Sequence, residues 1–209
     1  VFKRVKDCHN TMDFRELARR RLPGPIFHYI DGGADDEITK NRNTQAYEEC
    51  DLVPSVLAGV KDIDMSVTVM GKKLNMPLFC SPTALQRLFH HDGELAVARA
   101  AEKFGTMSGL SSLGTVDIHK MSKEISSPKL FQLYYHKDKG LNNYMIELCK
   151  EAQYDAIVLT VDTITGGNRE RDLRTGFTSP PKLTLKSLIS FITHPMWAIN
   201  YFTHEKFDL

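Results

Sequence analysis

Neither charge predominates in this 209-residue sequence, because its 27 basic and 26 acidic residues leave a formal net charge of +1. A nucleic-acid-binding surface usually shows a basic stripe and a high isoelectric point, so the charge balance argues against a nucleic-acid partner. The composition, with 42% apolar and 25% charged residues, is typical of a globular protein with one sizeable core.

Cysteine is scarce, and Cys8, Cys50, Cys80 and Cys149 stand far apart. No Cys-x-x-Cys pair or Cys/His cluster occurs, so the sequence predicts no metal site. Cys80 and Cys149 lie in apolar runs, where a free thiol behaves as a small hydrophobic group. A reducing, cytoplasmic location fits this cysteine usage best.

Long uninterrupted apolar runs are also missing. The first 21 residues are charged throughout, so we expect no secretory signal peptide in them. The most apolar stretch, 183–202, contains Lys186, His194, Pro195 and Asn200. A membrane-spanning helix needs about 20 predominantly apolar residues, so this stretch is not predicted to span.

The sequence does contain a recurring unit, in which a short apolar strand precedes an amphipathic helix. The predicted strands are 76–80, 106–110, 129–134 and 155–161, and the helices between them are 93–104, 116–124 and 141–152. Strands that alternate with helices indicate a parallel sheet. We therefore predict an α/β fold.

The polar residues that follow the strands distinguish two architectures. A doubly wound sheet usually begins with a glycine-rich turn, and Ser81-Pro82-Thr83-Ala84 is not one. In a TIM (β/α)8 barrel, the chemistry lies at the carboxyl ends of the strands. The residues there are Thr83, Ser111, Gln132, Tyr134, Thr160 and Asp162. We predict a TIM barrel.

Three segments follow from this prediction. Residues 1–75 form an N-terminal segment of helices and loops, with helices expected at 12–21 and 35–42. Residues 76–179 form the first half of the barrel, and residues 180–209 begin a mobile loop after the fourth strand. Four units of eight would leave open sheet edges, so we expect the same gene or a second chain to supply the other half.

Six segments carry a resemblance to a known family, in the family's order and over almost the whole chain. They are 27–37 (FHYIDGGADDE), 81–84 (SPTA), 110–112 (LSS), 131–134 (FQLY), 159–163 (LTVDT) and 168–173 (NRERDL). Together they resemble the FMN-dependent 2-hydroxy-acid oxidising family, to which glycolate oxidase, flavocytochrome-type lactate dehydrogenase and mandelate dehydrogenase belong.

The resemblance implies that FMN binds at the carboxyl end of the barrel, and it assigns a role to each of ten residues. Pro82, Thr83 and Ala84 match the loop beside the flavin N5, and Ser111, Gln132 and Thr160 match polar contacts to the isoalloxazine ring. Tyr29 and Arg169 match groups that hold the substrate carboxylate, Tyr134 faces the substrate hydroxyl, and Asp162 orients the catalytic histidine.

Physical chemistry supports these roles, although each residue alone has a simpler explanation. A planar guanidinium suits a carboxylate, and a carboxylate behind a histidine raises its basicity. However, Tyr29 alone would be a core aromatic, and Arg169 lies in a charged run. Gln132 and Thr160 could satisfy each other, and Asp162 could cap a helix.

The implied reaction is oxidation of a small L-2-hydroxy acid to the 2-oxo acid, with electrons passed to a quinone or cytochrome-type acceptor. Leu113 stands where some oxidases carry tryptophan, which favours a lactate-like acid over glycolate. The alternatives are an oxygen-using oxidase, a flavin-dependent isomerase or phosphate-binding barrel, and a non-catalytic module that binds a membrane or partner.

The resemblance also implies partners and gaps. Residues 183–207 combine an apolar face with basic residues, as helices at a membrane surface do, so we expect contact with the inner membrane or another subunit. The family suggests a homotetramer. Its base histidine, flavin-contacting lysine and phosphate-binding arginine belong to the second half, and none of the eight histidines here matches the base. We expect the isolated chain to be inactive.

Overall fold

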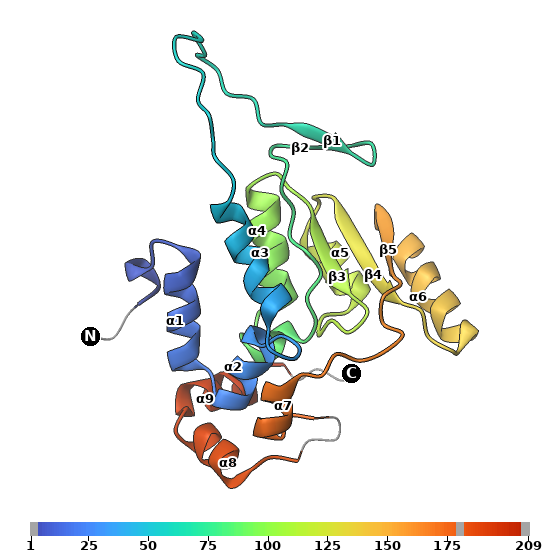
Figure 1. Ribbon diagram of the computed structural model, residues 1–209. Helices are drawn as coiled ribbons and strands as arrows, with labels where there is room; N and C mark the ends of the chain where they lie inside the picture. The colour runs from blue at the N-terminus through green and yellow to red at the C-terminus, as the bar shows by residue number, and fades with distance from the viewer. Residues whose placement is uncertain (1–3, 179–181, 206–209) are drawn as a thin grey trace. The chain divides into compact units, whose positions relative to one another are not determined.

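The computed structural model describes residues 4–178 and 182–205, which divide into two compact units. Unit 1 comprises residues 1–57 and 166–203, and unit 2 comprises residues 58–165 and 204–209. Among the described residues, no helix is long and apolar enough to cross a membrane. Figure 1 shows the helices and strands of both units.

Unit 1 is helical. Its elements are the short 3-10 helix η1 (Val5–Asp7), α1 (Thr11–Arg21), α2 (Gly24–Asp31), α3 (Ile38–Glu48), α7 (Glu170–Thr175), α8 (Leu185–Ile192) and α9 (Pro195–Thr203). Helix α2 is the centre of this unit, because α1, α7 and α8 all pack against it. Local signals set the helix starts: Asn10 caps α1, Thr184 caps α8, and Pro195 opens α9.

Unit 2 contains a three-stranded parallel sheet in the order β3 (Ser108–Ser111), β4 (Lys129–Tyr134), β5 (Ala156–Thr160). The predicted strand 76–80 is present only as a single parallel bridge from Cys80 to Ser108. Unit 2 also contains the 3-10 helix η2 (Gln86–Leu88), the hairpin strands β1 (Val67–Val69) and β2 (Lys72–Leu74), and the helices α4 (Glu94–Lys103), α5 (Ile118–Glu124) and α6 (Lys139–Glu151).

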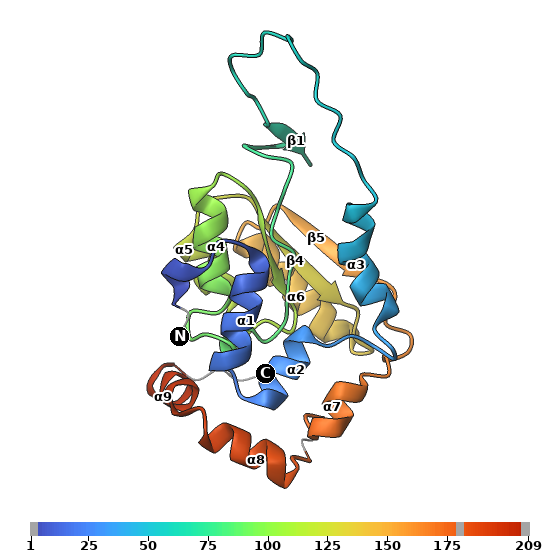
Figure 2. The same cartoon turned by 60° about the vertical axis from the view of Figure 1, so that its left-hand side comes forward.

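One face of the sheet carries the helices, and Figure 2 shows the same elements turned by 60°. Phe131 and Leu133 of β4 belong to the same apolar cluster as residues of α4, α5 and α6. Because side chains alternate along a strand, Leu130, Gln132 and Tyr134 belong to the opposite face. In a TIM barrel this opposite face is the barrel interior.

The interior face is apolar at the amino ends of the strands. Leu130 there packs with Met107 and with Leu74 of the β1–β2 hairpin, and Val67 and Ala156 border this cluster. The hairpin therefore covers the amino-terminal end of the interior face, and the polar residues lie nearer the carboxyl end. The sequence analysis expected helices and loops throughout residues 1–75 and did not predict this hairpin.

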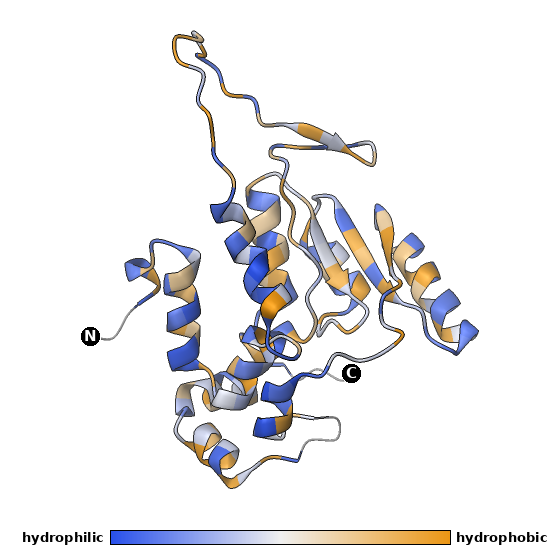
Figure 3. Cartoon of the chain, in the orientation of Figure 1, coloured by the Kyte–Doolittle hydropathy of each residue, from blue (hydrophilic) through white to orange (hydrophobic). Residues whose placement is uncertain are grey.

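Strand β5 is the edge strand, and its apolar side chains are exposed. Ile157, Val158 and Leu159 are 41%, 39% and 52% exposed, and the strand is coloured hydrophobic in Figure 3. A continuous apolar strand is the usual pattern for a parallel sheet covered on both faces. The exposed apolar side chains of β5 are therefore those expected of a strand whose two faces are covered in a complete barrel.

Two predicted boundaries differ from the structure. The helix expected at 35–42 begins at Ile38, so Asp35 and Asp36 precede it instead of occupying its first turn. Asp35 has a positive φ of 48° and is held by hydrogen bonds to Asn168. In residues 180–209, the structure contains α8 and α9, while residues 179–181 and 206–209 lie outside the described part.

Candidate functional site

A hydrogen-bonded row of polar side chains crosses the three strands of unit 2. The Ser111 hydroxyl donates to Gln132 Oε1 at 2.7 Å, and Gln132 Nε2 donates to Thr160 Oγ1 at 2.7 Å. Ser111 and Gln132 are buried. Three residues that the sequence placed at separate strand ends are therefore adjacent, in line with parallel register.

The row has a direction that determines what it can offer a ligand. The backbone N–H of Leu113 donates to Ser111 Oγ at 3.1 Å, so the hydroxyl proton of Ser111 is directed to Gln132. Because the Thr160 hydroxyl accepts from Gln132, its own proton remains available as a donor. A second proton on Gln132 Nε2 is likewise available. The row thus presents N–H and O–H donors at the interior face.

The loop that precedes η2 lies directly against β3. Gly109 N donates to Cys80 O at 2.9 Å, and a Cβ on Gly109 would stand 2.7 Å from Pro82 Cδ. Glycine is therefore required at 109 for Pro82 to approach the strand. Thr83 is exposed, and its hydroxyl accepts from Gln86 Nε2 at 2.7 Å. The structure places Pro82, Thr83 and Ala84 in the same unit as the polar row.

A buried glutamate, which the sequence analysis did not single out, supports this loop. Glu94 is 2% exposed. Its carboxylate accepts from the Thr115 N–H at 2.8 Å, from the Thr115 hydroxyl at 2.7 Å and from Gln86 N at 3.4 Å. Such hydrogen bonds offset the desolvation cost of a buried carboxylate. The sequence signal that could have pointed to Glu94 is its position directly after Gly93, at the start of a predicted helix.

Tyr134 and Asp162 lie on the same side of unit 2 but make few contacts. Tyr134 ends β4, is 36% exposed, and its N–H donates to Ser112 Oγ at 3.2 Å. Asp162 lies two residues beyond the end of β5 and is exposed. It does not serve as a helix N-cap among the described helices of the chain. Both side chains are accessible to a partner at the carboxyl ends of the strands.

Tyr29 and Arg169 are brought together in unit 1. The Arg169 guanidinium lies 5.3 Å from the centre of the Tyr29 ring, a cation–π contact, and it also donates to the Tyr29 carbonyl. Asp172 binds Arg169 Nε at 2.6 Å, and the Gly32 carbonyl accepts from Nη1 at 3.3 Å. Five N–H donors are present on a guanidinium, so Arg169 keeps donors for a further anion.

An ion-pair cluster holds the segments on either side of this pair. Arg171 binds Asp31 at 2.8 Å and Glu37 at 2.5 Å, and Arg15 also binds Asp31 at 2.9 Å. The hydrogen bond from Arg15, followed by that from Arg171, lowers the pKa of Asp31 below its usual value. The cluster connects α1, α2 and α7, so it fixes the backbone that carries Tyr29 and Arg169.

Unit 1 also contains a cavity of about 360 Å³ between α2, α7 and the start of α8. His28, Arg171 and Lys186 are among its lining residues, and none of the ten predicted site residues is. Burial, followed by the charge of Arg171, lowers the pKa of His28. This cavity is therefore separate from the two groups of predicted site residues.

The comparison with protein families decides the assignment. The model of the FMN-dependent dehydrogenases matches residues 18–208. This chain belongs to that family. Its fold is accordingly the N-terminal part of a TIM barrel, and FMN is the family's cofactor.

Among the family's members, glycolate oxidase 1 of Oryza sativa subsp. indica is 39% identical over 178 residues, which are 85% of this chain and 48% of the relative. The crystal structure of the monotopic membrane protein (S)-mandelate dehydrogenase matches with a TM-score of 0.90 and 31% identity, over 97% of this chain and 54% of that chain.

A soluble mutant of the membrane-associated (S)-mandelate dehydrogenase from Pseudomonas putida matches with a TM-score of 0.77 and 35% identity, over 86% of this chain and 51% of that chain. The chain thus spans about half the length of the relatives it matches. Members of the family include flavoenzymes that oxidise 2-hydroxy acids. Some of its members are membrane-associated.

The residues of unit 2 fit a flavin ring. A flavin edge alternates carbonyl and nitrogen acceptors with an N–H donor, and the Ser111–Gln132–Thr160 row offers directed donors in one line. Pro82 lies close to Gly109, two residues before Ser111 of that row. Protein groups of this kind orient a flavin and tune it through hydrogen bonds to its edge.

Proposed function

We propose that the full-length protein containing this chain oxidises a small L-2-hydroxy acid of the lactate type to the 2-oxo acid. The observation that carries the proposal is the polar row of Ser111, Gln132 and Thr160. Pro82, Thr83 and Ala84 complete the cofactor-binding group. Bound FMN would accept the two electrons that leave the substrate.

Substrate handling is assigned to the remaining predicted residues. Arg169 and Tyr29 bind the carboxylate, because a charged fork and a phenol suit its two oxygens. Their contact at 5.3 Å supports a common role. Tyr134 holds the substrate hydroxyl, and Asp162 orients a histidine that takes the proton. We propose that this base lies outside residues 1–209.

For the electron acceptor, we propose a quinone or a cytochrome-type protein reached at the inner membrane surface. Support comes from α8, in which polar side chains pack inward and apolar side chains face outward. This is the reverse of the usual arrangement in a helix of a soluble protein. Ser187 donates to the Thr175 carbonyl at 2.8 Å, and Ser190 accepts from Gly24 N at 2.8 Å, so the polar side packs inward. The outward residues are Leu185, Leu188, Ile189 and Ile192, all exposed.

Helix α9 extends this apolar surface within unit 1. Met196, Ile199 and Phe202 are exposed, and Trp197 stacks on Tyr201 at 5.2 Å. Helices that lie in a membrane interface combine such an apolar face with aromatic residues. A second copy of the protein could also cover this apolar face. If the protein does not attach to a membrane, we propose that it forms a homotetramer.

A substrate and acceptor panel tests the function. The full-length protein should reduce a quinone analogue with L-lactate faster than with glycolate or mandelate, and it should produce little hydrogen peroxide in air. Rapid peroxide formation would favour the oxygen-using oxidase. A colourless protein without FMN would contradict enzymatic function of either kind and favour the non-catalytic module.

A further inference from the structure

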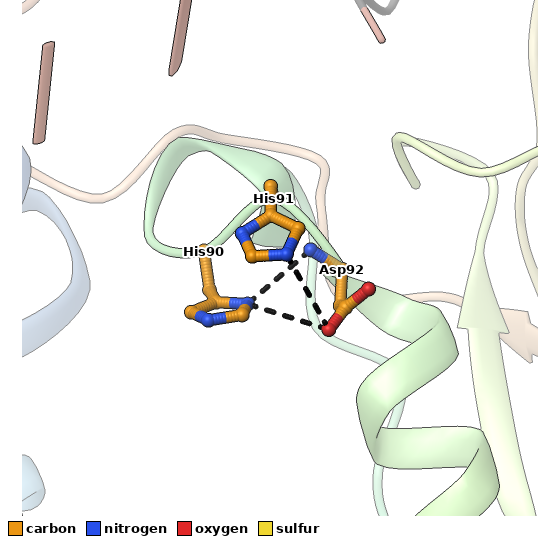
Figure 4. A group of neighbouring side chains, drawn as sticks. All are labelled: His90, His91 and Asp92. Carbon is orange, nitrogen blue, oxygen red and sulfur yellow. Dashed lines mark hydrogen bonds and ion pairs between the residues drawn. The ribbon is translucent and has the colours of Figure 1, made fainter. Parts of the chain in front are cut away.

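A cluster of metal-ligating side chains lies outside the flavin and substrate residues. His90, His91 and Asp92 follow η2, and each offers one ligand atom such that all three atoms lie within 4.8 Å of one another (Figure 4). We propose that this cluster binds a divalent transition-metal ion of the zinc class, with His204 as a further ligand.

The spacing of the ligand atoms is close to what zinc requires. His91 Nε2 lies 3.7 Å from Asp92 Oδ2, and His90 Nδ1 lies 3.9 Å from the same oxygen. His90 Nδ1 accepts a hydrogen bond from the Asp92 N–H at 3.2 Å, and it must release this bond to bind the ion. Around tetrahedral zinc, with bonds of about 2.0–2.2 Å, neighbouring ligand atoms stand roughly 3.3 Å apart. Small rotations of partly exposed side chains close this difference, and the ion reaches them from solvent.

A third imidazole lies against the cluster. His204 stacks on His91 with ring centres 3.9 Å apart, and His91 stacks on His90 at 4.2 Å. The neighbouring Glu205 binds Arg87 at 3.2 Å and also binds Lys120, which fixes the backbone of His204. All of these residues belong to unit 2. His204 is outside the group of ligand atoms that lie within 4.8 Å of one another, so its ring has to turn out of the stack to bind the ion.

The donor set selects the class of ion. Neutral imidazole nitrogens together with one carboxylate suit zinc, copper, nickel or iron, whereas calcium and magnesium prefer oxygen ligands alone. The sequence predicted no metal site, because it contains no cysteine-bearing metal pattern. The proposal revises that expectation on geometric grounds, and it does not depend on the proposed enzymatic function.

The ion would cross-link two segments of unit 2 that are far apart in the sequence. It would join His204 to the segment 85–92, which continues from Pro82–Ala84 and leads into the buried Glu94. A metal cross-link here stabilises the loop that we assign to the flavin.

The test uses the full-length protein without a histidine tag, after removal of metal with a chelator. Zinc affinity is measured by competition with a chromogenic chelator, and stoichiometry by elemental analysis after desalting. We expect one zinc ion per chain and a rise in Tm on adding zinc. Asp92→Asn and His204→Ala should each weaken binding by at least about tenfold.

Two variants at one position separate metal binding from ring stacking. His91→Phe keeps an aromatic ring in the stack but removes the nitrogen, and His91→Pro removes the ring as well; both should lose the zinc-dependent rise in Tm. His119→Ala, an exposed histidine that contacts Glu151, is the matched control and should bind zinc normally. Equal zinc binding by wild type, His91→Phe and His91→Pro would overturn the proposal.

Discussion

Gln132 connects three strands, because its Oε1 accepts from Ser111 and its Nε2 donates to Thr160. Substituting Gln132 should therefore disrupt both hydrogen bonds. In the full-length protein, Gln132→Met removes the acceptor for Ser111 and the donor to Thr160 while preserving volume. We expect FMN to bind about tenfold more weakly, because one net hydrogen bond contributes roughly 0.5–1.5 kcal/mol.

The measurement is FMN release on dilution, followed by flavin fluorescence. Gln45→Met, an exposed position on α3, serves as the matched control and should retain wild-type affinity. Unchanged FMN affinity in Gln132→Met would indicate that Gln132 and Thr160 only satisfy each other in the barrel interior.

Arg169 has a different predicted phenotype, because we assign it to the substrate. In the full-length protein, Arg169→Met should leave FMN content near stoichiometric while kcat/KM falls by about two orders of magnitude or more, as for loss of a charge-assisted pair. The variant should also unfold more easily, since Arg169 binds Asp172 and two backbone carbonyls within unit 1.

Arg174→Met provides the control for removing an exposed guanidinium of the same helix region, and it should keep wild-type kcat/KM. Arg174 pairs with Glu170 on the surface. If Arg169→Met instead loses its flavin at a temperature where it remains folded, Arg169 belongs to the cofactor site.

At the scale of elements, the exposed apolar side of α8 determines the membrane prediction. In the full-length protein, Leu188→Gln combined with Ile192→Gln should move the protein from the membrane fraction to the soluble fraction. Each apolar side chain withdrawn from water contributes about 1.5–3 kcal/mol, so two account for a large change in partitioning.

The control is Leu173→Gln on α7, which is also exposed in unit 1 and lies outside α8 and α9. Fractionation and light scattering are measured together. If the α8 variant and wild type show the same distribution and the same oligomeric size, this surface neither attaches to a membrane nor assembles subunits, and the oxygen-using oxidase is favoured.

Sequence patterns predicted α1, α4, α5 and α6 and three of the four expected strands, but they predicted no helix at α2 or α7. The helix expected at 93–104 is confirmed as α4, because its 3.6-residue apolar periodicity and its terminal glycines are local signals. Strand 76–80 was expected but reduces to one bridge at Cys80, since pairing depends on neighbours that no local pattern reveals.

The β1–β2 hairpin has a recognisable signal in the sequence. Residues 67–74 read VTVMGKKL, with apolar and polar residues alternating before Met70-Gly71. Both of these turn residues have positive φ, as two-residue hairpin turns of type I′ require. The buried role of Glu94 was harder to predict, because its partners Thr115 and Gln86 come together only in the fold.

For the molecule as a whole, β5 and the family comparison support the same conclusion. The exposed apolar strand β5 and the coverage of about half of each relative both support a larger barrel in the functional protein. We predict that residues 1–209 alone, if soluble, do not oxidise lactate, glycolate or mandelate in a dye-linked assay. Turnover by this chain without a complementing fragment would contradict the assignment of the base outside it.

The central claim is that this chain supplies the flavin and substrate-carboxylate contacts of an FMN-dependent 2-hydroxy-acid enzyme. Anaerobic mixing of the purified full-length protein with L-lactate tests it most directly. The account predicts a yellow protein whose visible flavin absorbance disappears on mixing and returns when a quinone is added. A protein that binds FMN stoichiometrically but whose flavin stays oxidised with lactate, glycolate and mandelate would contradict the claim.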